Sequence, residues 1–198
     1  MFRAVSIILF VSAFICSCTP APPLYKGAYQ AHYKRGNDTA MDERYARHAD
    51  SIMRLRPGFP LTLEQNTEEA LQFVWLRSFH PGVYLKIEKQ DKEIRLHLKE
   101  YPLDNNKAPS KDTSFVLAPA TWNELKAGLE QIQFDKISSV ERVELGCADG
   151  ATWDLEYLDQ KQPYHYVRRH CTIPKPFKDY CLQLIRLSGY KVKPSEIY

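Results

Sequence analysis

The chain has 198 residues, with 27 basic against 24 acidic side chains and a net charge of +3. This near-neutral balance, without a block of like charge, argues against a nucleic-acid-binding protein. The length allows one domain with a real core, and twelve tyrosines indicate a packed globular part rather than a disordered chain.

The N-terminus has the layout of a secretory signal peptide. Arg3 precedes an apolar run from Ala4 to Ile15, which is short of the roughly 20 residues that a bilayer span needs. The run ends in Ile15-Cys16-Ser17-Cys18. This resembles a lipobox, with an aliphatic residue at −3, a small one at −1 and cysteine at +1. Cys16 at −2 departs from the commonest form, and Ser17 selects Cys18 over Cys16.

The lipobox resemblance implies a bacterial lipoprotein that is cleaved before Cys18 and held on the membrane by acyl chains such as palmitate on that residue. An ordinary cleaved signal and an uncleaved anchor are the alternatives. The resulting division is a signal peptide over residues 1–17, a lipidated cysteine with a flexible Pro-rich tether over 18–40, and a single globular domain over 41–198.

The residues after Cys18 contain no run of Asp or Glu. In lipoproteins resembling those of the Bacteroidetes, such a run often marks export to the cell surface. We therefore expect a cell-envelope protein on the periplasmic face, with the outer membrane as its site.

Two helices are predicted first. Apolar residues recur at helical spacing from Met41 to Leu55, and Pro57-Gly58 follows. A second helix is predicted over residues 62–79, with His80-Pro81-Gly82 ending it.

Alternating apolar and polar residues then predict a hairpin of residues 83–88 and 94–101, followed by a short strand over 113–117. A helix is expected over 119–131, and short strands over 134–137 and 140–145. A second hairpin joins 153–158 to 164–169, and a last helix runs over 174–187 until Gly189 ends it. The predicted fold class is α+β: an antiparallel sheet built from two hairpins plus a short strand, with helices packed on one face.

The second hairpin has a predicted register. If it closes near residue 161, Leu155 lies opposite Val167 and Asp154 opposite Arg168. Leu155 and Val167 would share the buried face with Trp153, while Asp154 and Arg168 would form an exposed pair.

Three cysteines remain besides Cys16 and Cys18, so at most one internal disulfide forms. The register places Ala151 opposite Cys171, and a turn can fold Cys147 back toward it. Cys147–Cys171 is the pairing we consider first. Cys171–Cys181 and no bridge at all are the alternatives, and Cys181 suits a small buried core position.

One stretch resembles a pattern in uncharacterised bacterial proteins. It comprises the Asp-Gly turn and Thr-Trp of residues 149–153, Leu155-Glu156, and the Tyr-His-x-Val-x-Arg strand of residues 164–169. The Trp75–Pro81 segment belongs to the same pattern. The resemblance implies an α+β envelope domain of unknown function and supplies no catalytic residue.

A group of acid–base residues could form a catalytic or metal site if the fold gathered them: His80, Asp149, Glu156 and His165. As separate residues they are a helix end, a turn and strand-surface groups, and we prefer that interpretation. No catalytic motif occurs, so we expect no enzyme, cofactor or metal.

The function expected is a binding or assembly module that meets an unknown envelope protein. Its candidate interaction surface comprises Trp153, His165, Arg168 and Arg169. A periplasmic hydrolase with an unrecognised His/Asp/Glu site, and an inhibitor or immunity-type lipoprotein, are the alternatives.

Overall fold

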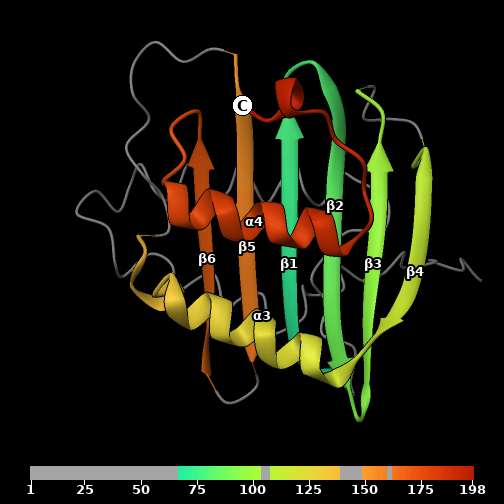
Figure 1. The fold of residues 1–198 in the computed structure, drawn as a ribbon, viewed down its shortest axis with the longest axis vertical. Coiled ribbons are helices and arrows are strands. Elements are labelled where there is room, and N and C mark those ends of the chain that lie inside the picture. The colour runs from blue at the N-terminus through green and yellow to red at the C-terminus, as the bar shows by residue number, and fades with distance from the viewer. Residues whose placement is uncertain (1–66, 104–107, 139–148, 160–161) are drawn as a thin grey trace, which may run out of the picture.

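A computed structural model describes residues 67–103, 108–138, 149–159 and 162–198 (Figure 1). Six strands and two α-helices make up most of this part, together with two short 3₁₀ helices. In chain order the elements are β1 (Thr67–Arg77), β2 (His80–Gln90), β3 (Glu93–Tyr101), β4 (Lys111–Leu117), α3 (Pro119–Gln131), η1 (Phe134–Lys136), β5 (Ala151–Asp159), β6 (Gln162–His170), α4 (Lys175–Leu187) and η2 (Pro194–Glu196).

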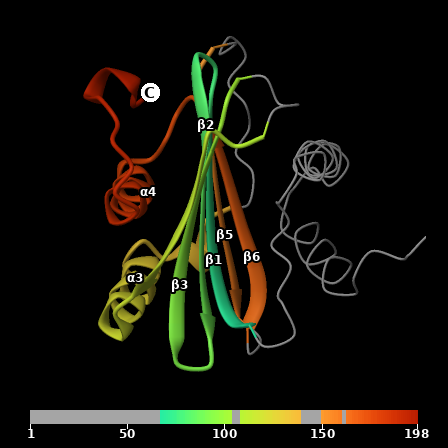
Figure 2. The ribbon, with the colours of Figure 1, turned by 90° about the vertical axis from the view of Figure 1, so that its right-hand side faces the viewer.

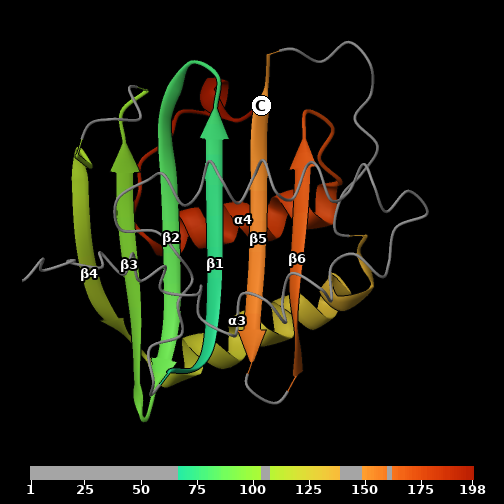
Figure 3. The ribbon, with the colours of Figure 1, turned by 180° about the vertical axis from the view of Figure 1, so that it is seen from behind.

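The strands form one sheet in the order β4-β3-β2-β1-β5-β6, and every neighbouring pair is antiparallel (Figure 3). β1 lies in the middle and pairs with β2 on one side and β5 on the other. The fold is therefore α+β with an antiparallel sheet, as predicted.

Both helices lie on one side of the sheet (Figure 2). Because side chains alternate along a strand, every second residue points to this side. Phe73, Leu85, Leu96 and Leu155 are among those residues, and all are buried in the main core with the apolar residues of α3 and α4. The opposite side of the sheet carries Val74 and the other strand residues that alternate with the core-facing ones. We call this side the second face.

The sequence explains where α3 begins and where α4 ends, and one side chain of α3 bonds to the sheet. α3 begins at Pro119, whose fixed φ suits the first turn of a helix. Its Trp122 donates from Nε1 to a carboxylate oxygen of Glu69 on β1, at 3.1 Å. Gly189 follows α4 with a φ of 68°, the left-handed conformation that ends many helices.

The helix predicted over residues 62–79 is wrong, because residues 67–77 form β1. A central strand with both faces buried reads as a nearly continuous apolar run, and Ala70, Leu71, Val74 and Trp75 also satisfy helical spacing. His80 accordingly begins β2 instead of ending a helix.

The strand predicted over residues 134–137 is also wrong, because Phe134–Lys136 form the 3₁₀ helix η1. The strand predicted over 140–145 and the helix predicted over 41–55 lie outside the described residues. The predicted register of the second hairpin is confirmed, since Leu155 pairs with Val167 and Asp154 with Arg168.

Candidate functional site

The four predicted acid–base residues do not come together. His80 lies at the start of β2, where its Nδ1 is 3.0 Å from the hydroxyl of Tyr198. His165 lies on β6, with Nε2 at 3.1 Å from the carbonyl oxygen of Ile137. Glu156 points to the second face of β5, whereas Asp149 lies in the connection before β5. Within the described residues, no group of three or more His, Cys, Asp or Glu side chains could hold a metal ion.

The predicted interaction surface is divided between the two faces of the sheet. Trp153 is fully buried and packs against Trp75, with ring centroids 5.0 Å apart. His165 and Arg169 are also buried on the helix-covered side. Arg168 lies on the second face, so these side chains share no exposed surface.

Asp154 and Arg168 form an ion pair in which the carboxylate is fully buried and the guanidinium partly buried, so their predicted exposure is wrong. Arg168 donates from Nε to Oδ1 of Asp154 at 2.6 Å and from Nη2 to Oδ2 at 2.5 Å. The hydroxyl of Tyr166 also donates to Oδ1, at 3.2 Å. Burial alone would lower the pKa of Arg168, but the neighbouring carboxylate raises it above its usual value. Burial, together with Asp154, raises the pKa of Tyr166.

A second polar group lies on the same face of β2 and β3. Glu88 Oε1 lies 2.9 Å from Nε2 of His97, and Oε2 lies 2.5 Å from the ammonium of Lys86. The hydrogen bond with His97 is the largest influence, and together these partners lower the pKa of Glu88 to about 2 despite its partial burial. Farther along the same face, Tyr84 and Tyr101 pack edge to face, with ring centroids 4.8 Å apart.

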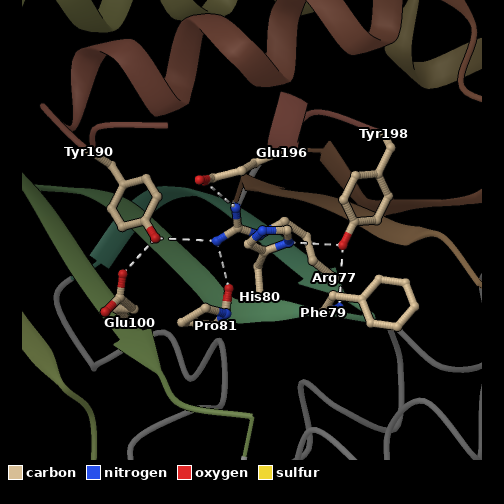
Figure 4. A network of polar contacts seen from close by, with 8 residues as sticks. All are labelled: Arg77, Phe79, His80, Pro81, Glu100, Tyr190, Glu196 and Tyr198. Atoms are coloured by element: carbon tan, nitrogen blue, oxygen red, sulfur yellow. Dashed lines mark hydrogen bonds and ion pairs between the residues drawn. The ribbon is translucent and has the colours of Figure 1, made fainter. Parts of the chain in front are cut away.

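Arg77 joins the end of β1 to the C-terminal segment (Figure 4). Its Nη2 donates to the carbonyl of Pro81 at 2.8 Å and to the hydroxyl of Tyr190 at 3.2 Å, and its Nη1 lies 3.5 Å from Glu196. The guanidinium stacks over Trp75, 4.3 Å from the ring centroid. We call these contacts the Arg77 clamp. The sequence contains no local signal for it, because Tyr190 and Glu196 are 113 and 119 residues away.

Two tyrosines extend the clamp. Tyr190 donates to a carboxylate oxygen of Glu100 at 2.5 Å. Tyr198 accepts from the backbone N–H of Phe79 at 3.3 Å (Figure 4). The C-terminal segment is thus fastened over the end of the sheet where β1 meets β2.

The outer edge of the sheet at β4 is open among the described residues. Five successive residues, 112–116, are exposed, and they include the apolar side chains of Phe115 and Val116. β4 pairs with β3 without a bulge, and it contains no proline. Proline, bulges and charges are the usual protections of an edge strand, and here Lys111 and Asp112 supply charge at one end only. We call residues 111–117 the β4 edge.

One end of the sheet carries two further exposed apolar residues, Phe79 and Leu103, with 64% and 57% of their surface exposed. Phe79 lies in the turn between β1 and β2, and Leu103 follows β3. We call this pair the apolar tip.

Cys171 is disulfide-bonded, whereas Cys181 is free and buried. The Cys171–Cys181 pairing is therefore excluded. The partner of Cys171 lies outside the described residues, so the Cys147–Cys171 pairing stays a prediction. Burial raises the pKa of the Cys181 thiol, which disfavours its reactive thiolate form.

No protein-family model matches the chain, and no curated protein matches its sequence. None of the helices in the described part of the chain is long and apolar enough to cross a membrane.

Proposed function

We propose that this chain is a lipid-anchored protein of the bacterial envelope whose folded part is a non-enzymatic binding or assembly module. The anchor is supported by the signal-like N-terminus and by Ser17-Cys18, where cleavage would expose a cysteine for acylation. Two or more acyl chains on Cys18 would hold the domain firmly, on the periplasmic face of the outer membrane.

The β4 edge carries the binding part of the proposal. An exposed edge strand can accept an extended peptide as an additional strand, with backbone hydrogen bonds giving affinity and side-chain contacts giving specificity. Phe115 and Val116 point to opposite faces of the sheet, so an added strand would meet an apolar side chain on each face. The partner would be an extended segment of another envelope protein.

Catalysis is not part of this proposal. His80, Glu156 and His165 lie at separate places of the sheet and have different partners, which favours the interpretation of these residues as structural. The proposed surface, β4, instead uses backbone groups and two apolar side chains.

The anchor is tested by replacing Cys18 with alanine in the full chain and following processing and membrane fractionation. We expect the variant to remain unprocessed at this site and to lose its acyl chains by mass spectrometry. A Cys18→Ala chain that is cleaved and membrane-bound like the wild type would overturn the anchor.

The β4 edge is tested in intact cells with a photo-crosslinking amino acid at Phe115, and with the same amino acid at Asn123 as a control. Asn123 is exposed on α3 and is not part of the edge strand. We expect a discrete adduct from position 115 only, which Val116→Lys abolishes and Asn123→Lys, with the same change in charge, retains. Equal crosslinking from both positions, or an adduct indifferent to Val116→Lys, would contradict the proposal.

A further inference from the structure

The second face of the sheet is buried, although both described helices lie on the other side (Figure 2). Val74, Tyr84 and Tyr101 on this face are each at most 1% exposed, and they form a hydrophobic cluster separate from the main core. Ala70 and Leu158, which are paired across β1 and β5, are buried on the same face. A sheet face without a second layer leaves its side chains in contact with water, so burial this complete requires a covering layer.

The described helices and strands do not supply this layer. The 3₁₀ helix η1 contributes Phe134 to the main core, and Ile197, directly after η2, packs against the same core. The connection between β3 and β4 lies at the end of the sheet where Tyr101 is, whereas Ala70 lies toward the other end, paired with Glu88. The layer must therefore come from residues outside the described ranges.

The buried polar residues of this face have partners on the face itself. Asp154 has its counter-charge in Arg168, on the neighbouring strand. The side-chain amide of Gln72 donates to a carboxylate oxygen of Glu156 at 3.5 Å. What the covering layer has to meet in the middle of the sheet is therefore chiefly the apolar cluster around Val74.

Residues 41–55, the helix predicted from the sequence, have the pattern of such a layer. The apolar residues recur three or four positions apart, which places them on one side of a helix: Met41, Tyr45, Ala49, Ile52 and Leu55. Charged residues occupy the opposite side: Glu43, Arg47, Asp50 and Arg54. A helix of this kind buries its apolar stripe against a core and leaves its charges in water.

The segment has the length and the reach to cover the middle of the face. A helix of 15 residues is about 22 Å long, close to the ~24 Å across six strands. Thr67, the first residue of β1, follows Leu55 by 12 residues, which span at most about 40 Å when extended. Val74 lies only seven residues, or about 23 Å, along β1 from Thr67.

The other undescribed segments fit less well. Residues 104–107 and 160–161 are too short to form a layer. Residues 139–148 follow Ile137, which packs against the main core on the helix-covered side. Residues 19–40 are the predicted Pro-rich tether and have no apolar stripe at helical spacing.

We propose that residues 41–55 form an amphipathic helix whose apolar stripe packs on the second face, over β2, β1 and β5. The sheet then lies between two helical layers, and the folded domain begins near Met41. This inference goes beyond the proposed function and is independent of it, because it requires neither a lipid on Cys18 nor a partner on the β4 edge.

The first experiment measures thiol labelling in the purified full chain carrying Val74→Cys. Mass spectrometry of the labelled peptides follows each cysteine separately, and the wild-type chain is the blank. Cys181 is an internal reference for the fold, because it is free and buried on the helix-covered side. Two changes in the proposed helix are compared: Ile52→Asp on the apolar stripe, and Ser51→Asp on the charged side, which adds the same charge.

We expect the thiol at position 74 to react as slowly as Cys181 in the otherwise wild-type chain. Ile52→Asp places an uncompensated charge in the contact, and it should accelerate labelling at position 74 at least about tenfold by opening this layer alone. Cys181 should stay slow, and Ser51→Asp should change neither rate. An unchanged rate at position 74 in Ile52→Asp, or the same acceleration in Ser51→Asp, would overturn the proposal.

A crosslinking experiment decides the case in which Ile52→Asp unfolds the whole domain and accelerates Cys181 as well. A photo-crosslinking amino acid replaces Ile52 or, as the control on the charged side, Arg54 in the purified full chain. Peptide mapping should find an intramolecular link from position 52 to β1, β2 or β5, and no such link from position 54. A link from position 52 to α3 or α4, a link only between two copies, or no link at all would overturn the proposal.

Discussion

Asp154 and Arg168 face each other across β5 and β6 and form a two-point ion pair in which the carboxylate is fully buried. The hydroxyl of Tyr166 donates to the same carboxylate. Such a pair is compensated only while both partners are present, because a single charge left behind in a buried site has lost its hydration and its counter-charge.

Removal of one partner is therefore expected to destabilise the fold strongly. Arg168→Ala should lower the free energy of unfolding by about 3–5 kcal/mol, as for other broken buried pairs. Replacing both residues with apolar ones, as Asp154→Leu with Arg168→Met, should cost less than the single change. Urea denaturation measures both. Lys175→Ala, which removes the exposed pair with Asp179, is the control and should change stability by less than about 0.5 kcal/mol. A double variant as unstable as Arg168→Ala would contradict this account.

The lowered pKa of Glu88 predicts that the folded protein loses stability in acid. Its pKa in the folded protein is about 2, against 4.5 for the ordinary group, because His97 and Lys86 favour its charged form. A group whose pKa is lowered by folding stabilises the folded state above its unfolded pKa. That contribution is lost as the pH falls from about 4.5 to about 2.

Glu88→Gln is the matching variant, because it retains the shape and removes the titration. Urea denaturation between pH 6 and pH 3 should show a shallower decline for the variant than for the wild type. Parallel pH curves for the two proteins would refute the assignment to Glu88.

The Arg77 clamp predicts that one substitution on β1 loosens the far end of the chain. Arg77→Met should lower the free energy of unfolding by about 2–3 kcal/mol, because it removes a charged donor together with its hydrogen bonds to Pro81 and Tyr190. Hydrogen exchange over residues 188–198 should accelerate. Arg77→Lys should restore little, since a single ammonium lacks the planar fork that reaches Pro81 and Tyr190 together. Lys193→Met is the control, and it should leave the exchange of this segment unchanged.

Gly128 shows where helix propensity and packing oppose each other. A Cβ at this position would lie 2.6 Å from Cε2 of Tyr180, whose hydroxyl is held by the carbonyl of Leu125 at 3.0 Å. Gly128→Ala should therefore destabilise by about 1–3 kcal/mol through overpacking, although alanine is the better helix former by about 1 kcal/mol.

The same substitution in a Tyr180→Leu background should lose most of its cost, since the ring is gone. Ala127→Gly, at the exposed neighbouring position, reports helix propensity alone. Thermal unfolding of the four variants is the measurement. If the stability changes of Gly128→Ala and Tyr180→Leu simply add in the double variant, the contact between the two residues is excluded as the cause of the destabilisation.

The disulfide of Cys171 can be tested by counting free thiols. In the non-reduced protein we expect no rapid thiol labelling while folded, because Cys181 is buried and burial raises its pKa. Unfolding should reveal the thiol of Cys181, which Cys181→Ser removes. If Cys147 is the partner of Cys171, Cys147→Ser adds one labelled thiol at Cys171. Peptide mapping that finds no such thiol would assign the bridge to another cysteine.

The second hairpin could be predicted from the sequence down to its register. Its two strands are close in the chain, and the alternation of Leu155, Tyr157 and Val167 leaves one arrangement that buries the apolar side chains. Local information was sufficient there. The burial of Asp154 could not be predicted, because alternation alone does not show whether the second face of a strand is also buried.

β1 could not be recognised for a related reason. Apolar residues on both of its faces produce a run that satisfies a helical period as well as a buried strand, and only pairing with β2 and β5 decides between them. The Arg77 clamp is also long-range, since it joins residues more than a hundred positions apart. The same error concealed the exposure of Phe79, because an apolar residue inside a predicted amphipathic helix is expected to pack against the core.

The central position of β1 has a consequence for how the sheet assembles. β2, β3 and β4 can each join the preceding strand as the chain continues, but β1 finds its other neighbour only in β5, whose paired residues are between 74 (Arg77 to Ala151) and 90 (Glu69 to Asp159) positions away. Closing so large a loop is slow compared with hairpin formation. Until β5 pairs with it, the free edge of β1 stays available to other chains. A truncated or stalled product that lacks β5 and β6 should therefore aggregate through β1, which is a protected central strand in the finished fold.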